Sequence, residues 1–381
     1  MLRAGPPRHS RRHAMPATSD PRLKEIEQAR RAVLHEGRSA TDVLVDRWFE
    51  RAWIERSWRR CLSNGQQPQQ RLGFDVLPAQ AMRRAEESSR DLLSAARPVM
   101  SRLARAIAGS RYFAVLTDAQ GTVVGVDGAI DRSDRRAQLI TRIGVDLSER
   151  AVGTTAIGAA LTELQPVWLH RGEHFFDDTA CYSCAGAPLI GPDGRTAGML
   201  DLTGIDAAER PELKHLVAQA ARSIENALAL AQPHALLLRL NWPGRGFGDD
   251  QDGLLCLDGD GWAVAINPGA RQMLGRLAEG ARVHCCDLFA MPWESLFDAL
   301  RQDTPQEVPL WSGLTLQVLA QAPGERAPAR APSGPARLPL RDLEAELIRK
   351  AVQEHRGNVM AAARMLGISR ATVYRKLGRQ R

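Results

Sequence analysis

The sequence predicts a multidomain α+β protein in which two antiparallel-sheet domains are followed by an all-α unit. Three observations support this prediction. At 381 residues the chain is too long for one hydrophobic core. Short strand-like runs joined by Gly-containing turns occur in two separate segments. A stretch rich in Pro, Ala, Gly and Arg, residues 321–338, then separates these segments from a basic helical end and is expected to be a flexible linker.

The first segment, residues 1–22, is basic and Pro-rich and is expected to be disordered. It lacks the apolar core of a signal peptide, and no apolar run in the sequence is long enough to span a bilayer. The six cysteines are too sparse for a disulfide scaffold. We therefore expect a cytoplasmic protein without a membrane partner, starting at Met1 or Met15.

Residues 23–108 are expected to form a helical lead-in. A break at Asn64-Gly65 and Pro68 divides it, and a second, strongly charged helix is predicted from about Pro78 to Arg97. Apolar residues of the first part follow one broad helical face: Val43, Leu44, Trp48, Trp53, Ile54, Trp58 and Leu62.

Residues 109–232 have the pattern of an α+β sandwich. "YFAVLTDAQGTVVGVDG" reads as a hairpin turned at Asp118–Gly121, and "AGAPLIGPDGRTAGMLDLTG" as a second hairpin turned at Pro192–Gly194. Between them "VGTTAIGAALTEL" predicts a small-residue helix and "PVWLHRGEHF" a strand. A long helix, "ELKHLVAQAARSIENALAL", closes the segment.

Residues 233–320 are expected to form a third unit. "GLLCLDGDGWAVAINPGARQMLG" predicts strand, Asp-Gly turn, strand and a short helix that Asn267-Pro268 opens and Gly275 closes. "LWSGLTLQVLA" supplies its last strands.

These two segments resemble known sensor domains. "SWRRCL", "GQQP", "GTTAIGAAL", "GEHF", "CAGAPL" and "GRTAGMLDLTG", between Ser57 and Leu230, resemble the N-terminal half of activators of acetoin and related catabolic operons. In that family they form a helical lead-in and a GAF domain, a sensor fold with a six-stranded sheet and flanking helices. The strand-turn-strand-helix order after His234 resembles the start of a PAS domain, which the resemblance implies senses a ligand or dimerises.

The C-terminal segment, residues 339–381, has the pattern of a helix-turn-helix. Val359, Ala363 and Leu366 lie on one helical face, and Val373 and Leu377 on the next. Gly367 can end the first helix, and Ser369 can cap the second. From Arg337 to Arg381 there are eleven Arg and Lys against four Asp and Glu, 11 − 4 = +7, which equals the net charge of the whole chain. This concentrated charge is typical of a DNA-binding surface.

"AAARMLGISRATVYRKL" resembles the C-terminal domain of the factor for inversion stimulation (Fis), which is a dimer that reads a two-fold-related DNA site. A solvated helical hairpin used only for dimerisation is the alternative. The second helix would enter the major groove of double-stranded DNA. Its expected DNA contacts are Arg370, Thr372, Tyr374, Arg375, Lys376 and Arg379.

Activators of this type usually carry an ATPase between sensor and reader that remodels polymerase with the sigma-54 factor. A phosphate-binding P-loop needs a Gly-Lys pair, and the sequence contains none. We therefore expect no ATPase activity. Regulation would work by occupying DNA, by recruiting or blocking RNA polymerase, or by pairing with an ATPase-bearing relative.

One aromatic and polar cluster predicts an effector pocket, because aromatic walls with a few polar groups suit a small molecule. The expected effector is a small carbonyl, alcohol or aromatic compound, and ordinary core packing is the alternative for Trp168, Phe175 and Phe176. The predicted pocket residues are Trp168, His170, His174, Phe175, Phe176, Tyr182 and Cys184.

Cys181 and Cys184 have C-x-x-C spacing, which could serve a metal or a redox dithiol. A second pair at matching spacing is missing, so we expect no metal and no cofactor, and His284-Cys285-Cys286 is expected to be strand or turn. Asp177, Asp178, His174 and Cys184 fit no catalytic motif, so an enzyme is not expected. The sequence predicts an effector-controlled, sequence-specific transcriptional regulator; a Fis-like architectural DNA-binding protein without effector control is the alternative.

Overall fold

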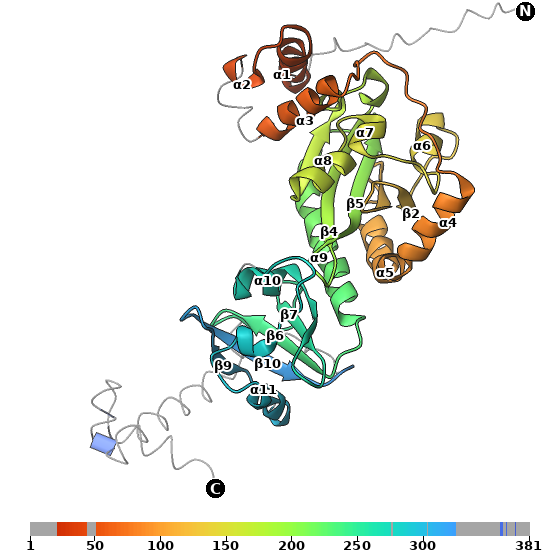
Figure 1. The fold of residues 1–381 in the computed structure, drawn as a ribbon. Helices are drawn as coiled ribbons and strands as arrows, with labels where there is room; N and C mark the ends of the chain where they lie inside the picture. The colour runs from red at the N-terminus through yellow and green to blue at the C-terminus, as the bar shows by residue number, and fades with distance from the viewer. Residues whose placement is uncertain are drawn as a thin grey trace, which may run out of the picture. The chain divides into compact units, whose positions relative to one another are not determined.

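The structure is a computed structural model that describes residues 21–43, 51–275, 277–302 and 304–324, together with Val359, Met360, Ala363 and Arg370. It contains two five-stranded antiparallel sheets (Figure 1). The elements before and in the first sheet domain are α1 (Pro21–Arg30), a π-helical turn (Arg31–His35), α2 (Ala40–Val43), α3 (Ala52–Ser63), α4 (Ala79–Ser88), α5 (Arg90–Ala106), β1 (Tyr112–Asp118), β2 (Val123–Gly128), α6 (Arg135–Ile140), α7 (Glu149–Val152), α8 (Ala156–Glu163), β3 (Val167–His170), β4 (Tyr182–Ile190), β5 (Thr196–Ile205) and α9 (Leu213–Leu230).

The first sheet has the order β2-β1-β5-β4-β3. Successive side chains of a strand alternate between the two faces of a sheet. One face, with Leu200 and Leu202 of β5, packs against α5 and α9. The opposite face, with Met199 of β5, packs against α3, α6, α8 and the segment that leads into β4. We call this second face the cavity face.

Within the described residues this sheet has five strands rather than the six that the resemblance implies. Beyond β2 the described chain forms isolated bridges, Thr122 with Asp146 and Val76 with Val145. The charged helix expected from about Pro78 to Arg97 is likewise two helices, α4 and α5. Ser89, between them, has φ −95° and ψ 7°, which departs from helical geometry and changes the direction of the chain.

The second sheet has the order β8-β7-β6-β10-β9, and every neighbouring pair is antiparallel. Its elements are β6 (Leu236–Asn241), β7 (Gly253–Leu257), β8 (Ala263–Ile266), α10 (Pro268–Leu274), α11 (Glu294–Asp298), β9 (Gln306–Pro309) and β10 (Thr315–Gln321). As predicted, Asn267 caps α10, since its side chain accepts from the Ala270 N–H at 2.8 Å, and Gly275 ends the helix with φ 95°. Cys285 and Cys286 lie in a 3₁₀ turn, Cys285–Asp287.

Four residues of the predicted helix-turn-helix are described, and all four are helical: Val359, Met360, Ala363 and Arg370. Ala363 is buried and Arg370 is exposed. The remainder of that segment, and the linker from residue 325, lie outside the described residues. The domain boundaries predicted from the sequence therefore remain predictions. No helix in the described part of the chain is long and apolar enough to cross a membrane.

Candidate functional site

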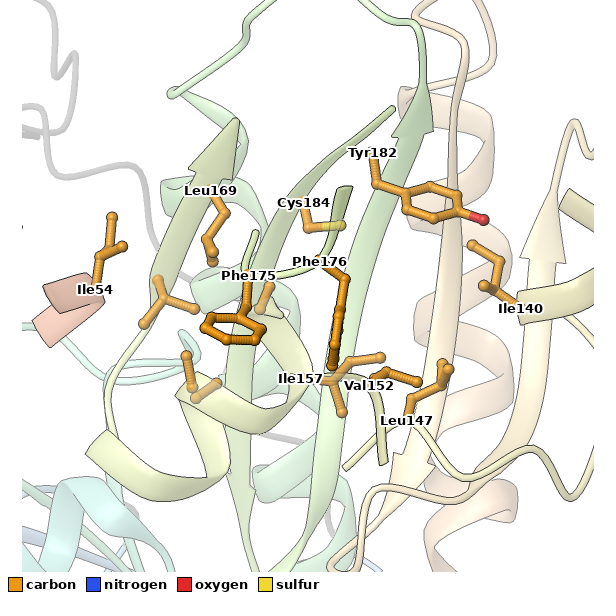
Figure 2. Packing of buried hydrophobic residues seen from close by; sticks show 14 of the residues in the cluster. Ile54, Ile140, Leu147, Val152, Ile157, Leu169, Phe175, Phe176, Tyr182 and Cys184 are labelled. Carbon is orange, nitrogen blue, oxygen red and sulfur yellow. The ribbon is translucent and has the colours of Figure 1, made fainter. Parts of the chain in front are cut away.

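A small cavity of about 30 Å³ lies on the cavity face of the first sheet. Figure 2 shows the apolar packing around it, in which side chains from the helices and from the segment before β4 converge on the strands. The cavity is lined by Phe74, Val115, Ile140, Leu147, Val152, Thr155, Ala156, Ile157, His174, Thr179, Tyr182, Cys184, Asp201 and Thr203. Its walls are mostly apolar, so the few polar side chains among them require an explanation.

Asp201 lies at the centre of the sheet, opposite Val115 of β1 and Gly186 of β4, and is 1% exposed. Its Oδ2 accepts a short hydrogen bond from the Thr203 hydroxyl. Because the Thr203 hydroxyl proton is used in this bond, the Cys184 thiol is the donor in the contact between Cys184 Sγ and Thr203 Oγ1, which are 3.6 Å apart. Oδ1 of Asp201 is buried without a hydrogen-bond partner.

Burial raises the pKa of Asp201 to about 7, because a carboxylate loses its hydration inside the protein. Near neutral pH a large fraction of Asp201 is therefore protonated. Since Oδ2 already accepts from Thr203, the proton belongs on Oδ1. The carboxyl can then donate a hydrogen bond to a molecule in the cavity.

His174 is the second polar group with an unpartnered atom. Its Nδ1–H donates to the Arg171 carbonyl at 2.9 Å, which fixes the tautomer, and Nε2 is buried without a partner. Burial lowers the pKa of His174 to about 4, so the ring is neutral at pH 7. A neutral ring protonated on Nδ1 offers Nε2 as an acceptor. Among the residues that line the cavity, protonated Asp201 thus offers an unpartnered donor and His174 an unpartnered acceptor.

The structure brings three of the seven predicted pocket residues to this cavity: His174, Tyr182 and Cys184. Phe175 and Phe176 contact each other edge to face at 4.9 Å and belong to the same core without lining the cavity. Trp168 and His170 are not brought there, because strand alternation places them on the opposite face. The His170 ring stacks on Trp168 at 6.3 Å, and its Nδ1 hydrogen-bonds the Ser183 hydroxyl at 2.8 Å.

Sequence reasoning missed Asp201 and Thr203. The signal was present in "MLDLTG", where two polar residues alternate with leucines in a strand that is otherwise buried. Polar residues at alternate positions usually mark a solvent-exposed face. Here the face with Asp201 and Thr203 is covered by helices, so the same pattern marks the polar part of a cavity.

Cys181 and Cys184, the C-x-x-C pair, contact different groups. Cys184 faces the cavity, whereas the Cys181 thiol donates to the Asp178 carbonyl at 3.8 Å. Burial raises the pKa of both thiols, which keeps them protonated and poorly reactive. Among the described residues no group of three or more His, Cys, Asp or Glu could hold a metal ion.

Of the predicted DNA-contacting residues, only Arg370 is described; it is helical and exposed. Thr372, Tyr374, Arg375, Lys376 and Arg379 lie outside the described residues.

Two segments of the chain match known protein families. Residues 57–226 match the N-terminal domain of MimR, and residues 339–379 match the bacterial regulatory protein, Fis family. The acetoin catabolism regulatory protein of Cupriavidus necator is 34% identical over 273 residues, which are 68% of this chain and 40% of that protein. The acetoin dehydrogenase operon transcriptional activator AcoR of Bacillus subtilis is 30% identical over 193 residues, 50% of this chain and 32% of AcoR.

The propane 2-monooxygenase operon transcriptional activator MimR of Mycolicibacterium goodii is 31% identical over 149 residues, 38% of this chain and 25% of MimR. The chain thus spans less than half the length of each of these relatives. Among solved structures, the E. coli DhaR(N)–DhaL complex covers 71% of this chain and 99% of its own, with a TM-score of 0.44 and 16% identity. The chain thus combines a segment similar to the MimR N-terminal domain with a segment similar to the Fis family, and over these parts it resembles the acetoin-operon activators.

Proposed function

We propose that this chain is a DNA-binding transcriptional regulator whose first sheet domain, a GAF-like sensor, binds a small alcohol or carbonyl compound in the cavity. The observation that carries the proposal is the pair of buried, unpartnered polar atoms, Asp201 Oδ1 and His174 Nε2, in a mostly apolar cavity. Leaving a buried polar atom unpartnered costs about 1–3 kcal/mol. A ligand that satisfies both atoms recovers this free energy on binding.

The two atoms define the ligand's chemistry. A hydroxyl group can donate to His174 Nε2 and accept from protonated Asp201, and a carbonyl group can accept from Asp201 alone. The space is small, since a cavity that binds benzene measures about 150 Å³, against about 30 Å³ here. An aromatic effector therefore does not fit without rearrangement, and a compound of a few heavy atoms is favoured. The relatives' names refer to acetoin catabolism, an acetoin dehydrogenase operon and a propane 2-monooxygenase operon, and acetoin and propane are both small molecules.

The rest of the chain provides the response. We propose that the second sheet domain, over residues 233–320, is PAS-like and that a Fis-type dimer contacts double-stranded DNA through residues 339–381. The absence of a Gly-Lys pair supports regulation without ATP hydrolysis by this chain. The output would then pass through RNA polymerase or an ATPase-bearing relative.

Calorimetric titration of the full chain with acetoin, acetone, 2-propanol and phenol tests the sensor. We expect at least one of the first three to bind, and phenol not to bind. Asp201→Leu and His174→Phe each replace a polar side chain, including its unpartnered atom, by an apolar one and should weaken binding at least tenfold, because one hydrogen bond to the ligand is worth about 1.4 kcal/mol. Trp168→Phe is the matched control, because Trp168 Nε1 is also buried and unpartnered but lies on the opposite face.

If Asp201→Leu and the wild type bind the same compounds with equal affinity, the cavity is not the effector site. The architectural alternative has its own measurement, which is selection of bound genomic fragments at physiological salt. Recovery of a few two-fold-symmetric sites supports a specific regulator. Recovery of DNA in proportion to its abundance would favour the architectural protein.

A further inference from the structure

The segment that carries His174 is held by the N-terminal helices rather than by its own domain alone. Arg30, the last residue of α1, has a side chain that is 15% exposed. Its Nη1 donates to the carbonyls of Gly172 at 2.9 Å, His174 at 2.5 Å and Phe175 at 3.2 Å. Its Nη2 donates to the Phe175 carbonyl at 3.2 Å and to Asp177 Oδ1 at 2.8 Å. One guanidinium therefore ties together the backbone on both sides of His174.

Glu173 provides a second attachment next to His174. Its carboxylate is fully buried and accepts from the guanidinium groups of Arg22 and Arg51 and from the His170 N–H at 2.7 Å. The Trp58 indole N–H, from α3, donates to the Glu173 carbonyl at 2.9 Å. Removing one partner from a buried ion pair is strongly destabilising. Undocking of α1 would therefore take the Arg22 partner away from the buried Glu173 carboxylate, and undocking of α3 would take Trp58 away from the Glu173 carbonyl.

The backbone of this segment is also strained. Arg171 has φ 47°, a left-handed conformation that costs a non-glycine residue about 1 kcal/mol. Its carbonyl accepts from Nδ1 of His174 and so helps to orient the ring, which lines the cavity and leaves Nε2 as the free acceptor. A strained conformation persists only when neighbouring contacts hold it, and here Arg30 binds the backbone carbonyls that follow Arg171, those of Gly172, His174 and Phe175.

We infer that Arg30 is a positioning residue of the cavity: it orders the backbone around His174, so that docking of α1 and binding of an effector favour each other. The second half of this inference rests on the proposed function. Coupling between two equilibria is reciprocal. If docked α1 makes the cavity bind more tightly, then an effector must stabilise docked α1 by the same factor.

Hydrogen exchange of the full chain, measured by mass spectrometry, tests this without any ligand. In Arg30→Ala we expect amides of residues 171–177 to exchange at least tenfold faster, while β4 and β5 keep their protection. Arg30→Lys keeps the charge but cannot reach four oxygens at once, and should give a smaller change in the same direction. Arg56→Ala is the control, since it removes an ion pair between α3 and Glu163 of α8 without touching residues 171–177.

The second arm adds acetoin or 2-propanol. Wild-type α1 should exchange more slowly with the probe bound, and Arg30→Ala should bind it at least fivefold more weakly, with Arg56→Ala unchanged. Unaltered exchange of residues 171–177 in Arg30→Ala overturns the inference, as does a uniform rise that includes β4 and β5. Should no probe bind the wild type while residues 171–177 still respond, the proposed function fails but the positioning role of Arg30 stands.

Discussion

Asp201 shows how one residue can define a site. A carboxyl group in the middle of a sheet, away from any cation, cannot remain charged cheaply, because ionised groups lose several kcal/mol of hydration on burial. Burial accordingly raises the pKa of Asp201 to about 7, so that near pH 7 about half of the molecules carry a neutral carboxyl group. A neutral carboxyl is a hydrogen-bond donor, which a carboxylate is not.

This leads to a pH dependence that Asp201→Asn should remove. In the unfolded chain an Asp has a pKa of about 3.9, against about 7 here when folded. Between these values the folded state binds more protons than the unfolded state. The contribution of Asp201 to stability is therefore present below pH 4 and is lost as pH rises toward 7.

We expect the free energy of unfolding of Asp201→Asn, relative to wild type, to increase by up to about 1.4 kcal/mol per pH unit between pH 4 and pH 7. Urea titrations at several pH values measure this difference. Taking the difference cancels other groups, such as Glu225, whose pKa burial also raises to about 7, and His174, whose effect has the opposite sign. A difference that does not change with pH would show that Asp201 is ionised throughout.

The site could be predicted from the sequence only in part. His174, Tyr182 and Cys184 were found because they are polar or aromatic and close in sequence. Trp168 and His170 were assigned to the same pocket because sequence distance does not reveal strand register: a residue one position along a strand points to the other face. Asp201 was missed because its environment is created by helices that are distant in sequence.

At the level of elements, α3 explains why "SWRRCL" stands out in the sequence. The Ser57 hydroxyl donates to Glu149 Oε2 at 2.6 Å, and Arg60 Nε donates to Glu149 Oε1 at 2.7 Å. Trp58 contacts Glu173, as described above, and Cys61 lies 3.6 Å from the Thr154 hydroxyl. Nearly every residue of this block attaches α3 to the cavity face. The helix could be predicted from its apolar spacing, but its partners could not.

Close contact of β1 and β5 places Asp201 opposite Val115, and Gly198 makes that contact possible. A Cβ atom at Gly198 would lie 2.2 Å from the Thr117 carbonyl oxygen and 2.7 Å from Leu92 Cδ2. Since a backbone oxygen cannot rotate away, Gly198→Ala should destabilise the protein by about 1–3 kcal/mol. Thermal unfolding measures the loss.

Gly259→Ala is the matched control, because nothing lies within 4 Å of a Cβ atom there. It should change stability by no more than about 0.5 kcal/mol. Equal melting temperatures for the two variants would mean that β1 and β5 are less tightly apposed than described.

At the scale of the whole molecule, charge is divided unequally. The segment from Arg337 to Arg381 carries +7, 11 − 4, which is also the net charge of the complete chain, so the remainder is neutral overall. This division would limit non-specific attraction to DNA to the C-terminal segment, as expected if that segment is the DNA-binding part that we propose. The sequence alone predicts this division, because charge can be counted without a fold.

Arg370→Ala and Arg375→Ala test the predicted reader. Each should cost about 1–3 kcal/mol of specific binding if the side chain contacts a base, and should mainly lower the salt dependence if it contacts a phosphate. Fluorescence anisotropy on a selected operator, at two salt concentrations, separates these effects. Intact specific binding by the double variant would show that the recognition helix is elsewhere.

The burial of the cavity has a consequence for timing. Val115, His174, Tyr182 and Asp201 are each less than 5% exposed, so a molecule enters or leaves only when the surrounding packing opens locally. Exchange is then paced by that opening rather than by diffusion. If the proposed sensor function holds, the time that an effector stays bound is therefore set by the stability of this packing, and a variant that loosens the packing should release the effector faster.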